Sequence, residues 1–264
     1  MDTLQYQSIK TIAKQQSFVD DTVVVEAPLQ ININETPYTV VMRTPGSDFF
    51  LIRGLLFAED IYKKKEALNY TIVQKENAIN SIINCSIPKE LLGKGYLNKR
   101  TLLSVSSCGI CGKQELKDIE LSGAALSHSK TISNANIQVM QANMQEAQAT
   151  FHKSGGSHAA AIFDESLSML TAQEDIGRHN AVDKCIGALL QESQLAQGKY
   201  LMVSGRVSYE IISKAFFAKI PVVVAVSACS SLAIDFAKEF GICLIGFSRD
   251  EKMTIYANPQ YINL

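Results

Sequence analysis

The chain has 264 residues, with 25 lysines and arginines against 26 aspartates and glutamates, and 47% of its residues are hydrophobic. This length predicts one large domain or two modest ones with a buried core, and the composition excludes a disordered chain. The balanced charge excludes a role that depends on bulk attraction to nucleic acid or to an anionic membrane. Because no signal-peptide core or membrane-spanning run is found, we expect a cytoplasmic protein whose six cysteines are reduced.

The N-terminal part has the patterns of a small α+β unit. Alternating β-branched residues over 22–43 predict two strands that form a hairpin around Asn34 and Glu35. Ser47 is expected to cap the helix that follows, and residues 70–87 return to strand character. The segment 91–130 lacks clear periodicity and is typical of a long, mobile loop.

The C-terminal part has a clearer rhythm. Ser133 is expected to open a helix whose apolar residues recur at helical spacing as far as Phe151 and which stops at Gly155. From His158 onward, strands alternate with helices. This alternation predicts an α/β fold with a mostly parallel sheet covered by helices.

Small polar residues and arginines gather where these strands end, at 174–183, 204–210, 227–231 and 247–252. Ligands of open α/β sheets bind beyond the carboxyl ends of the strands, where helix N-termini and arginines suit phosphate groups. The sequence therefore predicts a site for a phosphorylated, nucleotide-like ligand. Ordinary helix capping is the alternative at each exit, and we favour it for 227–231. The candidate residues are Arg178, His179, Ser204, Gly205, Arg206 and Arg249.

The histidines allow weaker assignments. His179 begins a helix, where it could bind a ligand, act as an acid or base, or only cap, and the sequence leaves these alternatives open. His158 precedes an apolar strand and is interpreted as structural. His128 and His152 are expected to be exposed.

Cys108 and Cys111 form a C-x-x-C pair within the stretch SSCGICG. Such a pair can hold half a zinc site, act as a redox dithiol or carry sulfur as a persulfide. The other cysteines are scattered singly, and the pair precedes the histidine that a zinc deaminase would place first, so no metal site is predicted. The strand-to-helix setting of a thioredoxin motif is also missing. Of the three uses, the interpretation that remains is a nucleophilic sulfur near a nucleotide-like site.

The segments SSCGICG, EDIGRHNAVDKCIG, SGRVSYEI, PVVVAVSACSSLA and GFSRDEKMTIYA resemble, in order and spacing, the FdhD family of formate dehydrogenase accessory sulfurtransferases. The resemblance implies a sulfurtransferase that takes persulfide sulfur from a cysteine desulfurase. It would pass this sulfur to the molybdenum or tungsten cofactor that formate dehydrogenase requires. Cys108 would carry the persulfide, with Cys111 as its partner.

The resemblance also implies a ligand and an architecture. The ligand is bis(molybdopterin guanine dinucleotide), bound as substrate, which a guanine nucleotide should mimic. Residues 131–264 should form a three-layer domain similar to cytidine deaminase, after a smaller α+β domain over 1–130 that ends in the C-x-x-C loop. The segment that matches the family's cofactor site comprises Phe247, Ser248, Arg249, Asp250, Glu251 and Lys252.

Two alternatives to sulfur transfer stay open. One is a cofactor-carrying chaperone of formate dehydrogenase, and the other is a dithiol oxidoreductase. The expected partners are the desulfurase and formate dehydrogenase, with neither nucleic acid nor membrane. The sequence does not decide between molybdenum and tungsten, between the two cysteines as the first to be loaded, or between a monomer and a homodimer.

Overall fold

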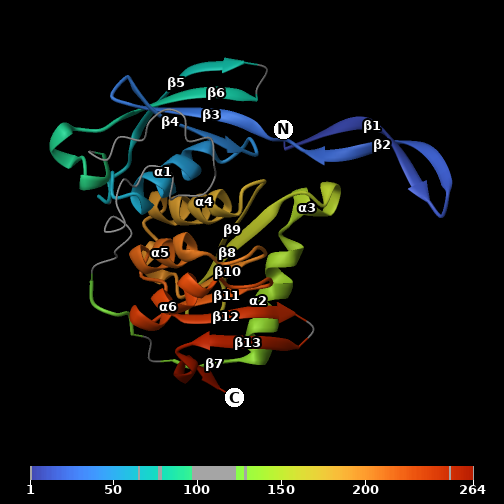
Figure 1. The fold of residues 1–264 in the computed structure, drawn as a ribbon. Helices are drawn as coiled ribbons and strands as arrows, with labels where there is room; N and C mark the ends of the chain where they lie inside the picture. The colour runs from blue at the N-terminus through green and yellow to red at the C-terminus, as the bar shows by residue number, and fades with distance from the viewer. Residues whose placement is uncertain are drawn as a thin grey trace.

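A computed structural model describes residues 2–64, 66–76, 79–96, 123–127, 130–249 and 251–263. Its C-terminal part is built on a six-stranded sheet in the order β13-β12-β11-β10-β8-β9 (Figure 1). The strands are β8 (His158–Phe163), β9 (Met169–Asp175), β10 (Tyr200–Val203), β11 (Val222–Ala225), β12 (Cys243–Arg249) and β13 (Lys252–Ala257).

The directions of these strands correct the expected mostly parallel sheet. Only β10, β11 and β12 run parallel to one another, whereas β8 is antiparallel to both β9 and β10, and β13 is antiparallel to β12. The reason is the length of the connections. A short turn joins β8 to β9 and another joins β12 to β13, and short turns join antiparallel strands, whereas a parallel neighbour needs a long crossover.

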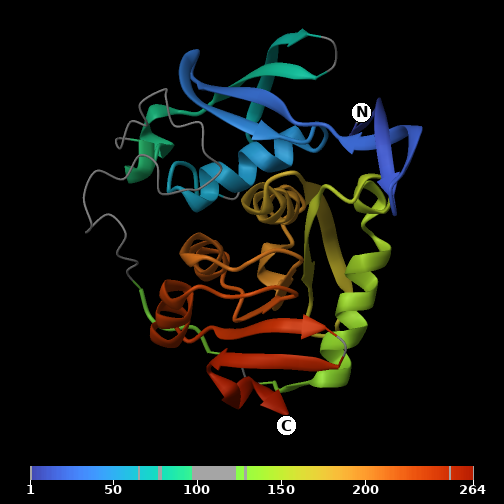
Figure 2. The ribbon, with the colours of Figure 1, turned by 45° about the vertical axis from the view of Figure 1, so that its right-hand side comes forward.

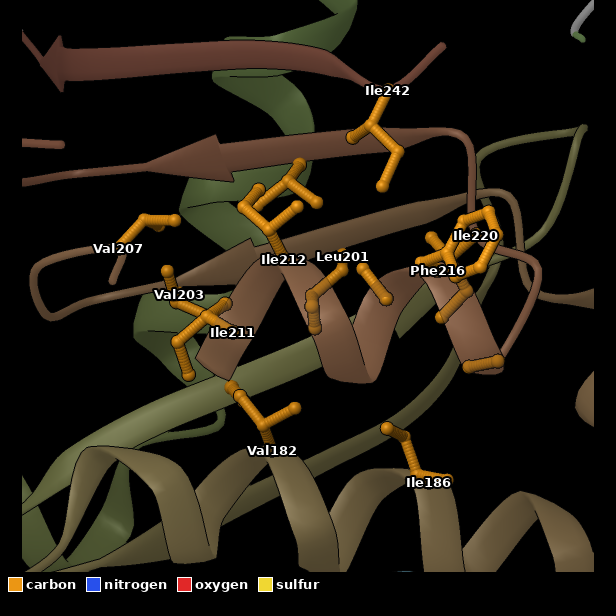
Figure 3. Packing of buried hydrophobic residues seen from close by; sticks show 14 of the residues in the cluster. Val182, Ile186, Leu201, Val203, Val207, Ile211, Ile212, Phe216, Ile220 and Ile242 are labelled. Atoms are coloured by element: carbon orange, nitrogen blue, oxygen red, sulfur yellow. The ribbon is translucent and has the colours of Figure 1, made fainter. Parts of the chain in front are cut away.

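Helices cover both faces of this sheet. On one face lie α4 (Arg178–Gln191), α5 (Tyr209–Phe217) and α6 (Ser231–Glu239), and α2 (Asn134–Glu146) covers the other (Figure 2). Successive strand residues point to opposite faces. Leu201 and Val203 therefore pack with Val182 and Ile211 of the helices on the first face (Figure 3), whereas Met202 packs on the α2 side.

The helix expected from Ser133 to Gly155 begins as predicted but is broken. Ser133 caps α2, since its hydroxyl accepts the Asn136 N–H at 3.2 Å. A second helix, α3 (Ala149–Ser154), then starts in a new direction. The carboxylate of Glu174 accepts the backbone N–H groups of Thr150 and Phe151 at 2.7 and 2.8 Å. This carboxylate stabilises a new helix N-terminus where the sequence pattern alone indicates continuation.

The N-terminal part contains a four-stranded sheet in the order β4-β3-β6-β5. Its strands are β3 (Ala27–Ile33), β4 (Thr36–Arg43), β5 (Asn69–Glu76) and β6 (Asn80–Ser86). The predicted hairpin turn at Asn34 and Glu35 is confirmed, with left-handed φ values of 50° and 68°. Both residues have φ above zero, as the two-residue turns that match the twist of a hairpin require.

Two N-terminal features differ from the expectations. Ser47 precedes α1 (Asp48–Ala58) at φ 56°, and its side chain makes no cap hydrogen bond, because capping requires extended backbone at that position. The sequence also gave no sign of the hairpin of β1 (Thr3–Ile12) and β2 (Gln15–Val24), which extends away from the rest of the molecule (Figure 1). Its turn residues, Ala13 and Lys14, are not typical hairpin residues.

Two short elements complete the fold. β7 (Ile132–Ser133) pairs in parallel with β14 (Ile262–Asn263), near the C-terminus. Among the described residues, no helix is long and apolar enough to cross a membrane. The division into domains at residues 130 and 131 stays a prediction.

The helices α1 and α4 are packed backbone against backbone. A Cβ atom at Gly54 of α1 would lie 1.9 Å from the carbonyl oxygen of Asp183 on α4. In the same way, a Cβ at Gly187 would lie 1.9 Å from the carbonyl oxygen of Phe50. Only glycine allows the helices to approach this closely, so this pair of residues fixes how the N-terminal part sits on the C-terminal sheet.

We expect Gly54→Ala and Gly187→Ala each to lower the free energy of unfolding by about 1–3 kcal/mol or more, because the new methyl group overlaps backbone atoms. The loss should occur although alanine by itself favours a helix by about 1 kcal/mol over glycine. Chemical denaturation measures it. Gln191→Ala, at an exposed position of α4, is the matched control and should be neutral. Unchanged midpoints for both glycine variants would contradict the close packing.

Candidate functional site

One edge of the six-stranded sheet brings two of the strand exits singled out in the sequence, 174–183 and 204–210, together with the start of β8. His158, the first residue of β8, is the ladder partner of Asp175, the last residue of β9. On the other side of β8, Ser204 extends β10: its N–H donates to the Ala159 carbonyl at 3.0 Å, and its hydroxyl accepts the Ala159 N–H at 2.9 Å. The start of β8 therefore lies between the exits of β9 and β10.

Arg178 and His158 meet at Gly205, the residue after Ser204. A Cβ atom at Gly205 would lie 3.3 Å from the Nδ1 atom of His158 and 3.3 Å from the Cβ of Arg178. Glycine at this position lets the loop lie against both side chains. Arg206 follows and is exposed, and its charge acts on His158. The structure thus gathers Arg178 and Arg206 around a histidine that the sequence analysis had interpreted as structural.

The guanidinium of Arg178 has an unsatisfied donor. Its Nε is buried and has no hydrogen-bond partner among the described residues. The neighbouring Cδ atom lies 3.4 Å from the position of a Cβ at Gly205, so this donor is close to the His158 side of the loop. A buried N–H without an acceptor costs about 1–3 kcal/mol, and a ligand oxygen would recover that cost.

His158 has a pKa below its ordinary value of 6.5. Burial is the largest cause, because it disfavours the charged imidazolium, and the positive charge of Arg178 comes next. Arg206 lowers the pKa further, and Asp175 opposes these effects. The imidazole is therefore neutral at pH 7. The sequence carried no signal for this role, because His158 comes beside Asp175 only through the pairing of β8 with β9.

His179 has different surroundings from its neighbour Arg178. Its side chain is 4% exposed, with Nε2 3.1 Å from the Ser208 hydroxyl and 3.5 Å from the Glu210 carboxylate. The Ser208 hydroxyl also donates to Glu210. His179 therefore connects the start of α4 to the start of α5, and its role in ligand binding stays a prediction.

Asp175 organises the turn between β9 and α4. One carboxylate oxygen accepts the Gly177 N–H at 2.8 Å and the Asn180 side-chain amide at 2.9 Å. The other oxygen pairs with the Lys184 ammonium at 2.8 Å. The aspartate is 0% exposed and the lysine 2%, so this is a buried ion pair.

The same network reaches the N-terminal part of the chain. The Lys184 ammonium donates to the Thr44 carbonyl at 2.9 Å, and the Thr44 N–H donates to Asp175 at 3.2 Å. Asn180 donates to the Met42 carbonyl at 2.8 Å. The segment 174–183, predicted to form a ligand site, therefore also joins two parts of the fold through Asp175 and Asn180.

The exit of β12 is less closely connected to the cluster. Phe247 is exposed with φ 52°, whereas Ser248 is buried, and its hydroxyl lies 3.5 Å from the Gln141 side chain of α2. Arg249 is exposed opposite Lys252 in the β12–β13 ladder, Glu251 is exposed at the turn, and Asp250 lies outside the described residues. The described contacts of Arg178 and Arg206 do not include Arg249, so its convergence with them stays a prediction.

The exit of β11 shows ordinary capping, as favoured from the sequence. The Ser230 hydroxyl accepts the Ala233 N–H at 3.3 Å at the start of α6. Val207 forms a parallel bridge with Cys229 in the same region. This exit therefore lies beside the loop that carries Arg206 and supports it.

The four cysteines that the structure describes are poor nucleophiles. Burial raises the pKa of Cys85, Cys229 and Cys243 to about 12, and it raises the pKa of Cys185 as well. At neutral pH they are thiols, whereas sulfur exchange requires a thiolate. The predicted pair, Cys108 and Cys111, lies outside the described residues. Within the described part, no three His, Cys, Asp or Glu side chains form a group that could hold a metal ion.

Comparison with known proteins identifies the family. The model of the FdhD/NarQ family matches residues 24–263. The chain belongs to this family. The sulfur carrier protein FdhD of Mycolicibacterium paratuberculosis is 40% identical, with 92% of each chain covered. That of Sulfolobus acidocaldarius is 39% identical over 93% of this chain and 92% of the relative.

A solved structure has the same fold. The crystal structure of a candidate formate dehydrogenase accessory protein from Desulfotalea psychrophila matches with a TM-score of 0.76 and 21% identity, covering 99% of both chains. At this identity the match establishes the fold alone, and it agrees with the predicted mixture of helices and strands. The hairpin of β1 and β2 lies almost wholly before residue 24, where the family match begins.

We expect Asp175→Asn to destabilise the protein by about 3–5 kcal/mol, because it leaves the Lys184 ammonium buried without its counter-charge. Urea denaturation measures the change. Glu165→Gln is the control, because Glu165 pairs with Lys130 at 3.2 Å on the surface, with both side chains exposed, and such pairs contribute at most about 1 kcal/mol. Equal midpoints for the two variants would show that the buried pair contributes no more than the surface pair.

Proposed function

We propose that the chain is a sulfurtransferase that carries sulfur as a persulfide on Cys108. The sulfur would come from a cysteine desulfurase. It would go to the molybdenum- or tungsten-containing bis(molybdopterin guanine dinucleotide) cofactor, which formate dehydrogenase requires. Membership of the FdhD/NarQ family supports the proposal, as do relatives named as sulfur carriers and a similar fold in a candidate formate dehydrogenase accessory protein.

The state of the cysteines is the observation that carries this proposal. A sulfur carrier needs an accessible thiolate, and all four cysteines described by the structure have a pKa raised by burial. By elimination, the carrier belongs to the C-x-x-C pair, whose spacing is known to lower a thiol pKa. Cys229 is near the site in the fold, yet its thiol is protonated at neutral pH.

The loading of sulfur onto Cys108 needs no added oxidant. The Cys108 thiolate attacks the terminal sulfur of the donor persulfide, a new S–S bond forms, and the donor cysteine leaves as a thiolate. For release, the Cys111 thiolate attacks the Sγ of Cys108, and the carried sulfur leaves as sulfide. The resulting Cys108–Cys111 disulfide must then be reduced by an external thiol before the next cycle.

The sheet edge supplies the binding part of the proposal. Arg178 and Arg206 present positive charge beside Gly205, and the buried Nε of Arg178 is without an acceptor among the described residues. Guanidinium groups bind phosphate oxygens through paired, charge-assisted hydrogen bonds. The pyrophosphate or guanine part of the cofactor suits these donors. With Arg249 and its neighbours in the 247–252 segment, they would hold the cofactor while the sulfur carrier approaches.

We extend the proposal to the architecture and the partners. The family resemblance supports a layout similar to cytidine deaminase for residues 131–264, with residues 1–130 as a smaller domain. The helix–sheet–helix layers of the C-terminal part agree with such a layout. The cysteine desulfurase and formate dehydrogenase are the proposed partners, in the cytoplasm.

Sulfur loading is tested by intact mass. After incubation with a cysteine desulfurase and cysteine, we expect the wild-type protein to gain the mass of at least one sulfur atom, and the reductant-treated sample to lose it. Cys108→Ala should gain none, because it lacks the attacking thiolate. Cys229→Ala is the matched control and should load like wild type, because partial burial raises the pKa of the Cys229 thiol and keeps it protonated. A wild-type chain that never gains sulfur would favour the chaperone, or the oxidoreductase if it reduces a model disulfide.

Ligand binding is tested by calorimetry with GDP. Each of Arg178→Ala, Arg206→Ala and Arg249→Ala should weaken binding by roughly tenfold to more than a hundredfold, since a charge-assisted hydrogen bond contributes about 1.5–3 kcal/mol. Lys199→Ala removes a lysine whose ammonium donates to the Ala196 carbonyl, at an exposed position, and should leave binding unchanged. Wild-type affinity in all three arginine variants, or equal affinity for ADP and GDP, would show that the pocket is misassigned.

A further inference from the structure

His158 lies where four elements of the fold meet. It begins β8, and the groups whose charge acts on it come from three other elements: Asp175 at the end of β9, Arg178 at the start of α4 and Arg206 after β10. Its Nδ1 is 3.3 Å from the position of a Cβ at Gly205, so the loop passes close to the ring. The imidazole is partly buried. The group is thus close to both arginines and still accessible at the sheet edge.

The position suits a group whose charge can change. A lysine or arginine here would add a third permanent positive charge beside Arg178 and Arg206, which the nearby Asp175 carboxylate, already paired with Lys184, would offset only in part. A neutral imidazole avoids this repulsion when the site is empty. When an anion binds between the arginines, it reverses the sign of the local field and favours the imidazolium.

We propose that His158 is a ligand-contacting residue that takes up one proton from solvent when a phosphate or pyrophosphate dianion binds beside Arg178 and Arg206, and that it then donates a hydrogen bond to the anion. This inference rests on the anion site of the proposed function and assigns that site a further residue and a pH dependence. The anion keeps its charge, and the proton remains on the imidazole until the ligand leaves.

The direction of the pH dependence follows from the two states. In the free protein, burial and the arginines hold the pKa of His158 below 6.5. In the complex, the added negative charge raises it. Binding is therefore strongest below the pKa of the free protein and weakens as the pH rises through the pKa of the complex. Each unit by which binding raises this pKa makes the limiting affinity at low pH roughly tenfold greater than that at high pH.

Calorimetry with sulfate and with GDP tests this inference. Sulfate stays a dianion between about pH 6 and pH 8, the range in which a histidine titrates, so any change in its affinity comes from the protein. Titrations in two buffers with different heats of ionisation count the protons taken up. We expect wild type to take up protons on binding, and to bind sulfate more weakly at about pH 8 than at about pH 6, by up to roughly tenfold for each unit of pKa shift.

His158→Gln should bind with little proton uptake and a flat sulfate profile. His152→Gln is the matched control, because His152 is exposed on α3, and it should behave like wild type. The same proton uptake in His158→Gln as in wild type would overturn the inference. If wild type binds GDP without proton uptake, only this inference fails, whereas binding of neither GDP nor sulfate removes the anion site as well.

A second measurement does not depend on the variant folding. In wild-type protein with 13C-labelled histidine, the titration midpoint of one of the four histidine resonances should move to higher pH when GDP or sulfate is added. Midpoints that stay unchanged with the bound anion would overturn the proton uptake by His158.

Discussion

The backbones of α1 and α4 touch at Gly54 and Gly187, and much of the remaining structure depends on this contact. Two helices that lacked a glycine at these positions would be held apart by side chains. At the observed separation, the strand end before α1 reaches the turn before α4, so that Thr44 hydrogen-bonds to Asp175 and Lys184. Because Gly54 and Gly187 have no side chains, the two helices can approach closely enough for a polar junction to form between segments far apart in the sequence.

The same junction positions the candidate site. Asp175 pairs with Lys184 on the side of the N-terminal sheet and holds the Gly177 N–H that precedes Arg178. It also faces His158 across the β8–β9 ladder and raises the pKa of that histidine against the effect of the arginines. One buried carboxylate therefore sets both the start of α4 and part of the electrostatic field at the sheet edge. The stability of the fold and the proposed ligand site therefore depend on the same residue.

The two chemical tasks proposed for the chain have opposite requirements. Sulfur exchange needs a thiolate that can reach a donor and then an acceptor, whereas cofactor binding needs donors held at fixed positions. The described cysteines are fully or partly buried, which keeps them protonated, and the arginines at the sheet edge are supported by a bonded network. The division of these tasks between the C-x-x-C pair and the sheet edge follows from this difference.

The sequence by itself determined the family, the mixture of helices and strands, the β3–β4 hairpin and the cap at Ser133, because motifs, periodicity and capping are local. Tertiary structure decided the rest. The break after α2 depends on Glu174, which comes from a distant strand. His158 joined the site because antiparallel pairing brings the start of β8 beside the end of β9. The polar residues of 174–183 are divided between the candidate site and the junction with the N-terminal part, because only tertiary packing fixes which of these side chains face which part of the fold.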